Sequence, residues 1–222
     1  MLDQDKHMQW GRLAGLLLLV QLLGGIFINF SLYGPLFSDP GFLVKGADYA
    51  NQVGWGALIS LDMSAVVLLI TLFSYKLFKE AQLELTMALL VFATIALATT
   101  IMESISMMTL VSYSEAYVAA EANQKASLEA GRVIVASIRN WTHYMAQITA
   151  GSAFLVFYLM LLVGRFVPRL LAWFGVLAAF LQIIAVASVF VGFEINFALL
   201  APIALANLIH GLWLLTKGYA KA

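Results

Sequence analysis

Six long apolar segments constrain the fold of this 222-residue chain more than any other feature. A helix needs about 20 mostly apolar residues to cross the hydrocarbon core of a bilayer. Only 11% of the residues are charged, whereas soluble domains contain about 25%. The sequence therefore predicts an all-α integral membrane protein, a single domain over residues 1–222 built as a bundle of six transmembrane helices. The apolar segments lie at roughly 13–33, 53–73, 85–111, 138–163, 170–192 and 197–216.

Charge and cysteine content exclude several classes of function. The formal net charge is zero, so nothing indicates a nucleic-acid partner. No cysteine is present, which excludes disulfides, thiolate chemistry and cysteine-ligated metal clusters. The first apolar segment lacks a small-residue cleavage site and is followed by further apolar segments. We therefore expect a retained first span rather than a signal peptide, with the lipid bilayer as the main partner.

The distribution of lysine and arginine predicts the orientation. Cytoplasmic loops are enriched in these residues. Eight of them lie on the face that holds both termini: Lys6, Arg12, Lys76, Lys79, Arg165, Arg169, Lys217 and Lys221. Four lie on the other face: Lys45, Lys125, Arg132 and Arg139. We therefore expect both termini in the cytoplasm and two outer loops, 34–52 and 112–137, the second of which could form a short amphipathic helix.

Polar residues within the apolar segments are the candidates for function, because ionisable side chains at membrane depth usually face the protein interior or a cavity. With about 1.5 Å of rise per residue, Asp62, Glu103, Asn207 and His143 lie roughly 14, 12, 15 and 8 Å from the outer end of their spans. The spacing of Arg139 and His143 places them on one helix face. The sequence predicts a ligand-binding cluster with these members: Asp62, Glu103, Arg139, Asn140, His143, Asn207 and His210.

Other interpretations of the same residues stay open. Interhelical hydrogen bonds hold membrane helices together, so the cluster could be purely structural. Haem ligation by His143 or His210 is a further alternative, but their depths differ by about 12 Å. A zinc site of Asp62, Glu103 and His143 is chemically possible, yet the ligands are not closely spaced. We predict no catalytic residue, no metal and no cofactor, and consider an enzyme less favoured than a non-enzyme.

Several motifs are similar to those of a known family. They are GRLAGLLLL from Gly11, GPLFSDPGFLVKGADYANQVGWGALISLDM, the surroundings of Glu103, IRNW, GRFVPRLLAWFGVLAAFL and PIALANLIHGLWLLTKGY. From Gly11 almost to its end, the chain resembles the bacterial membrane family called domain of unknown function 4386 (DUF4386). The resemblance implies a six-helix bundle in the bacterial inner membrane and no established activity. Two positions depart from the family pattern, which often has an arginine at Thr100 and an acidic residue at Asn207.

Three classes of function follow from these observations. The first is the binding or transport of a small polar or amphiphilic ligand, or proton relay, at an outward-facing polar cluster. The second is an accessory or scaffold subunit of a membrane complex, in which the polar layer is structural and a membrane protein partner covers an exposed surface. The third is a haem-binding or metal-dependent membrane enzyme.

Overall fold

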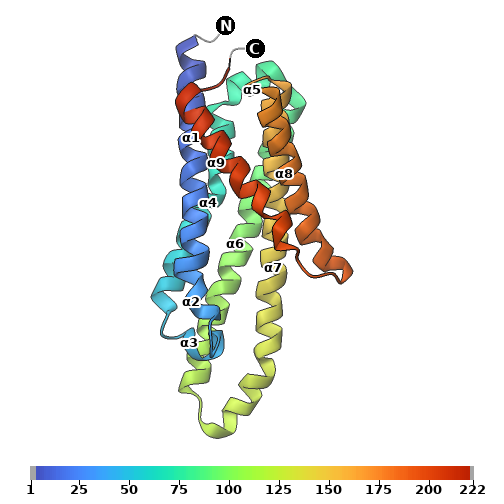
Figure 1. Ribbon diagram of the computed structural model, residues 1–222. Helices are drawn as coiled ribbons and strands as arrows, with labels where there is room; N and C mark the ends of the chain where they lie inside the picture. The colour runs from blue at the N-terminus through green and yellow to red at the C-terminus, as the bar shows by residue number, and fades with distance from the viewer. Residues whose placement is uncertain (1–3, 221–222) are drawn as a thin grey trace. The chain divides into compact units, whose positions relative to one another are not determined.

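The computed structural model describes residues 4–220 (Figure 1). All regular structure in these residues is helical, and no strand occurs among them. Six helical segments are long and apolar enough to cross a membrane, as expected of a multi-pass membrane protein: Asp5–Phe37, Ala50–Phe73, Leu83–Ala119, Ala122–Val163, Arg169–Val191 and Phe197–Lys217. The all-α class and the six predicted spans are therefore confirmed. The side of the membrane on which the termini lie stays a prediction, and Lys221 is outside the described residues.

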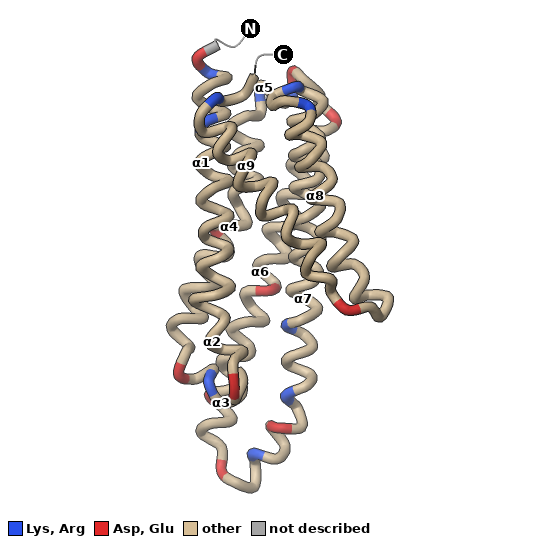
Figure 2. The backbone as a smooth tube through the Cα atoms, viewed as in Figure 1, with Lys and Arg blue, Asp and Glu red and all other residues tan. Residues whose placement is uncertain are grey.

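The helices follow one another with short connections. Their bounds are α1 Gln4–Ile26, the π-helical turn η1 Phe27–Tyr33, α2 Gly34–Phe37, α3 Phe42–Lys45, α4 Ala50–Phe73, α5 Tyr75–Ala81, α6 Leu83–Ala119, α7 Ala122–Val163, α8 Arg169–Ala187, the 3-10 turns η2 Ser188–Val191 and η3 Phe197–Leu199, and α9 Ala201–Lys217. The central stretches of α1, α8 and α9 contain no charged residue (Figure 2). This pattern is what a lipid-exposed helix requires.

The segment 112–137, expected as an outer loop, is helical almost throughout. It comprises the last turns of α6 and the first turns of α7, which are separated only by residues 120 and 121. Its alanine, glutamate and leucine residues have high helix propensity, so the helices continue beyond the apolar stretches. With 42 residues, α7 is about 63 Å long. It is therefore about twice as long as the roughly 30 Å hydrocarbon core is thick.

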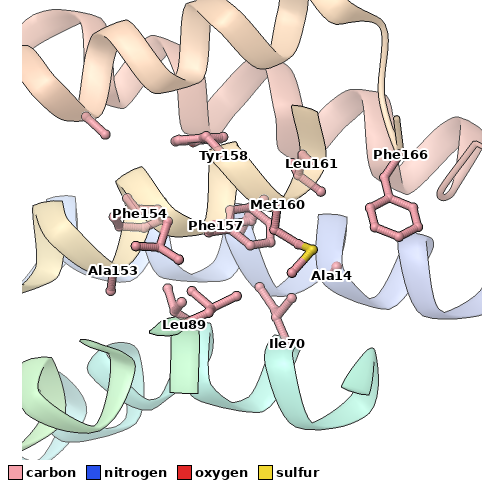
Figure 3. Packing of buried hydrophobic residues seen from close by; sticks show 14 of the residues in the cluster. Ala14, Ile70, Leu89, Ala153, Phe154, Phe157, Tyr158, Met160, Leu161 and Phe166 are labelled. Atoms are coloured by element: carbon pink, nitrogen blue, oxygen red, sulfur yellow. The ribbon is translucent and has the colours of Figure 1, made fainter. Parts of the chain in front are cut away.

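The chain divides into two compact units, which are described separately. The described residues of unit 1 are 4–22, 64–97 and 147–220, and unit 2 comprises residues 23–63 and 98–146. In unit 1, large side chains of α7 form the centre of the core. Phe157, Tyr158 and Met160 are fully buried and pack with residues of α1, α4 and α6 (Figure 3).

Close backbone contact joins α1 to α9 within unit 1. A side chain at Gly15 would place its Cβ 2.3 Å from the backbone nitrogen of Leu215. At Gly11 the corresponding Cβ would lie 2.0 Å from the backbone nitrogen of Tyr219. Small residues at this spacing are typical of membrane helices whose backbones touch. Glycine is therefore required at both positions.

Candidate functional site

Unit 2 contains a short folded segment, residues 34–49, that is fixed to the C-terminal turns of α6. The Ser114 hydroxyl donates to the carbonyl of Leu43 at 3.0 Å and accepts from the amide of Ala47 at 2.9 Å. Phe42 and Leu43 are buried in the same cluster as Leu110 and Met107. Hydrogen bonds and apolar contacts thus hold α2 and α3 beside α6, where they form part of a cavity wall.

Glu103 of α6 and His143 of α7 form a direct hydrogen bond. The Nδ1 of His143 lies 2.6 Å from Oε1 of Glu103, and the two side chains are 23% and 15% exposed, respectively. Because a carboxylate only accepts, Nδ1 carries the shared proton. A second polar contact joins the same helices, between the hydroxyls of Ser106 and Thr142 at 2.9 Å. The predicted proximity of Glu103 and His143 is therefore present in the structure.

Arg139 is held by groups that do not neutralise its charge. Its Nε donates to Sδ of Met107 at 3.4 Å, and its Nη1 donates to Oδ1 of Asn140 at 3.3 Å. The guanidinium lies over the ring of Phe37, with Cζ 4.6 Å from the ring centroid. Among residues 4–220, no carboxylate lies within 4.0 Å of Arg139. The guanidinium is therefore oriented by neutral neighbours without a direct counter-ion.

A cavity of about 240 Å³ lies beside Arg139. Its apolar walls include Phe37, Phe42 and Leu110, and its polar side chains are Arg132, Arg139 and Asn140. No acidic residue lines it. Arg132 forms an exposed ion pair with Glu129 at 3.1 Å, whereas Arg139 is half-buried. The cavity therefore combines an apolar surface with a fixed positive charge.

Asp62 does not join this group. It lies in the middle of α4, is exposed, and has no hydrogen-bond or ion-pair partner among the described residues. Trp55 and Leu58, which precede it by two turns and one turn, are also exposed. Val66, one turn after Asp62 on the same stripe, is buried, as are Val67 and Ile70. The exposed stripe of α4 therefore ends near Asp62, and the nearly uniform hydrophobicity of α4 does not show where it ends.

Asn207 and His210 belong to unit 1 and have partners there. The hydroxyl of Tyr158 donates to Oδ1 of Asn207. Nδ1 of His210 donates to the carbonyl of Ala206 at 2.8 Å, and its ring centroid lies 4.5 Å from that of Tyr158. Within residues 4–220, no group of three or more histidine, aspartate or glutamate side chains is placed to hold a metal ion. Haem ligation by either histidine stays an alternative prediction.

Tyr158 and Phe37 contact predicted site residues but were not themselves predicted: Tyr158 donates to Asn207, and Phe37 lies under the guanidinium of Arg139. Tyr158 could have been found from the sequence, because a phenol at membrane depth usually needs a hydrogen-bond partner. Phe37 could not, since it lies in a connection whose path depends on the contacts of Ser114.

Comparison with known proteins places the chain in a family. The model of a domain of unknown function (DUF4386) matches residues 13–218. The chain belongs to the DUF4386 family. No curated protein and no solved structure matches it. DUF4386 membership agrees with the six membrane-crossing helices and specifies no activity, so the functional argument depends on the site.

Proposed function

We propose that the protein binds a small amphiphilic anion in the cavity of unit 2, from the membrane face opposite the termini. The observation that supports this proposal is the half-buried guanidinium of Arg139, which lines the cavity without a carboxylate partner. A cation removed from water is costly unless it is paired. An anionic group in the cavity would supply the missing charge.

The rest of the cavity favours a ligand with an apolar part. Phe37, Phe42 and Leu110 would contact a short hydrocarbon or aromatic group. Ligand pockets commonly have volumes of about 300–1,000 Å³, so a cavity of about 240 Å³ fits a small molecule or one end of a longer one. Arginine binds carboxylate and phosphate in a forked geometry. A short-chain carboxylate satisfies both features.

Hexanoate is the probe for a binding test. The full chain is placed in phosphatidylcholine nanodiscs, and hexanoate binding is measured by isothermal titration calorimetry against protein-free nanodiscs. Hydrogen bonds to charged groups contribute about 1.5–3 kcal/mol, so Arg139→Gln should weaken hexanoate binding by about 10- to 150-fold. Arg169→Gln removes the same charge from the exposed start of α8 and should change little.

Three results would contradict the proposal. They are no detectable hexanoate binding at millimolar concentration, equal binding of hexanoate and hexanol, and equal weakening by the two arginine variants. The first would show that the cavity does not bind a short-chain carboxylate, the second that it does not select the negative charge, and the third that the effect is general electrostatics.

A second candidate function, contact with another membrane protein, is favoured by Asp62. An exposed carboxylate halfway along a transmembrane helix costs about 2.5–3.5 kcal/mol in lipid, so a covering helix with a hydrogen-bond donor would stabilise it. Under this interpretation, Asp62→Leu should dissociate a complex that is isolated by mild detergent extraction from the native membrane. If Asp62→Leu only raises thermal stability and leaves the isolated species unchanged, Asp62 faces lipid and the contact does not exist.

A further inference from the structure

We infer that unit 1 contains a second site, which binds the anionic headgroup of a membrane phospholipid. This site is separate from the cavity beside Arg139 and does not depend on the function proposed for it. It is a cavity of about 390 Å³ between the start of α1, the end of α4 and the start of α5. Lys6 and Lys76 supply its cations, Gln9 adds an amide, and Trp10 and Tyr75 supply aromatic rings.

The wall of this cavity is held in place by contacts within unit 1. The ring of Trp10 stacks on that of Phe73, with centroids 5.7 Å apart and an interplanar angle of 6°. The turn between α4 and α5 is anchored by Ser74, whose hydroxyl lies 3.0 Å from the hydroxyl of Tyr219. Ser74 and Tyr219 are both buried. The two lysines are therefore attached to backbone that is fixed by packing.

The charges of the lining favour an anion. No acidic residue lines the cavity. Among the described residues, no carboxylate forms an ion pair with Lys6 or Lys76, although Asp5 and Glu80 lie close to them in sequence. Basic pockets between transmembrane helices bind phosphate-containing headgroups. Two ammonium groups from different helices favour a phosphodiester headgroup with a net negative charge over a zwitterionic headgroup, which carries a cation of its own.

The depth of the cavity favours a lipid over a soluble phosphate compound. Two candidate spans terminate at it, one starting at Asp5 and one ending at Phe73. Tryptophan and tyrosine are enriched at this level, between headgroups and acyl chains. Leu72, Phe73 and Leu77 complete the lining with apolar surface, which the upper part of an acyl chain would cover. The cavity thus presents cations, interfacial aromatic rings and apolar side chains together.

Native mass spectrometry with two lipids tests this site. The detergent-solubilised full chain is given equal amounts of phosphatidylglycerol and phosphatidylcholine, and the ratio of bound lipids is measured. We expect phosphatidylglycerol to be retained preferentially. A lysine near anionic lipid contributes about fivefold, so the double variant Lys6→Gln/Lys76→Gln should lower the preference by about 25-fold.

A matched control removes two charges from other helix ends of unit 1. The double variant Arg169→Gln/Lys217→Gln has the same net charge as the test variant, and neither residue lines the cavity. It should keep the preference of the wild type. Lys6→Arg/Lys76→Arg should also keep it, and circular dichroism melting of every variant separates loss of binding from loss of folding.

The lipid site is refuted by any of three results. These are equal retention of the two lipids by the wild type, an equal loss of preference in the control variant, and complete displacement of phosphatidylglycerol by soluble glycerol 1-phosphate. The last result would assign the cavity to a soluble phosphate compound.

Discussion

Removing the hydrogen bond between Glu103 and His143 should weaken unit 2 in a strongly non-additive way. The atoms are 2.6 Å apart and both side chains are mostly shielded from solvent. Interhelical hydrogen bonds in membrane proteins contribute about 0.6 kcal/mol on average and about 1.7 kcal/mol at most. Because this contact is short and involves a carboxylate, we expect a coupling energy near that maximum, about 1.5 kcal/mol.

The single variants should cost more than the coupling energy. Glu103→Leu leaves the Nδ1 proton of His143 without its acceptor, and His143→Leu leaves the carboxylate without its donor. An unsatisfied polar group at this depth costs about 1–3 kcal/mol. The double variant removes both polar groups and should be destabilised by less than the sum of the two single effects.

The assay is unfolding of the purified full chain by sodium dodecyl sulfate in mixed micelles, followed by circular dichroism. A control cycle on Ser106→Ala and Thr142→Ala removes a neutral contact between the same helices. Its coupling should be smaller, about 0.5 kcal/mol. If the effects of the Glu103 and His143 variants add within about 0.3 kcal/mol, the hydrogen bond does not contribute and the structural argument for unit 2 is wrong.

Three further predictions concern unit 1. Tyr158→Phe leaves the side-chain oxygen of Asn207 without its donor and should lower the unfolding free energy by about 1–2 kcal/mol in denaturant titration. Gly15→Ala places a Cβ 2.3 Å from a backbone nitrogen of α9 and should cost about 1–3 kcal/mol in thermal melting. The control Gly25→Ala lies in the part of α1 that belongs to unit 2; its Cβ meets no atom within 4 Å, and it should not destabilise. Burial raises the pKa of Tyr219 above its ordinary value of 10.0. The protonated phenol of Tyr219 therefore stabilises the folded state below pH 10, and this contribution decreases as the pH rises above 10. Tyr219→Phe should remove the corresponding decrease in the unfolding free energy at high pH.

Hydropathy predicted the six spanning helices because each apolar segment is long enough to cross a bilayer on its own. It could not predict that α6 continues to Ala119 and that α7 begins at Ala122. The last turns of α6 and the first turns of α7 are polar, and helix propensity and contacts with residues 34–49 keep this part of the chain helical.

The polar site was partly predictable for a similar reason. Depth along the helices predicted that Glu103 and His143 lie close together, because residues at one level on neighbouring helices can touch. Depth says nothing about helix rotation, so the sequence could not place Asp62 on the exposed face of α4. It also could not place Phe37 under the guanidinium of Arg139, because that contact depends on the tertiary folding of the segment around α2.

The most direct test of the proposed anion site is photolabelling of the full chain with a diazirine-bearing hexanoate, followed by peptide mass spectrometry. The account predicts labelling within residues 37–43 and 132–140 or at Leu110, which line the cavity beside Arg139. It also predicts that excess hexanoate suppresses this labelling and that Arg139→Gln abolishes it. Labelling elsewhere in the chain, or labelling that persists in Arg139→Gln, would contradict the account.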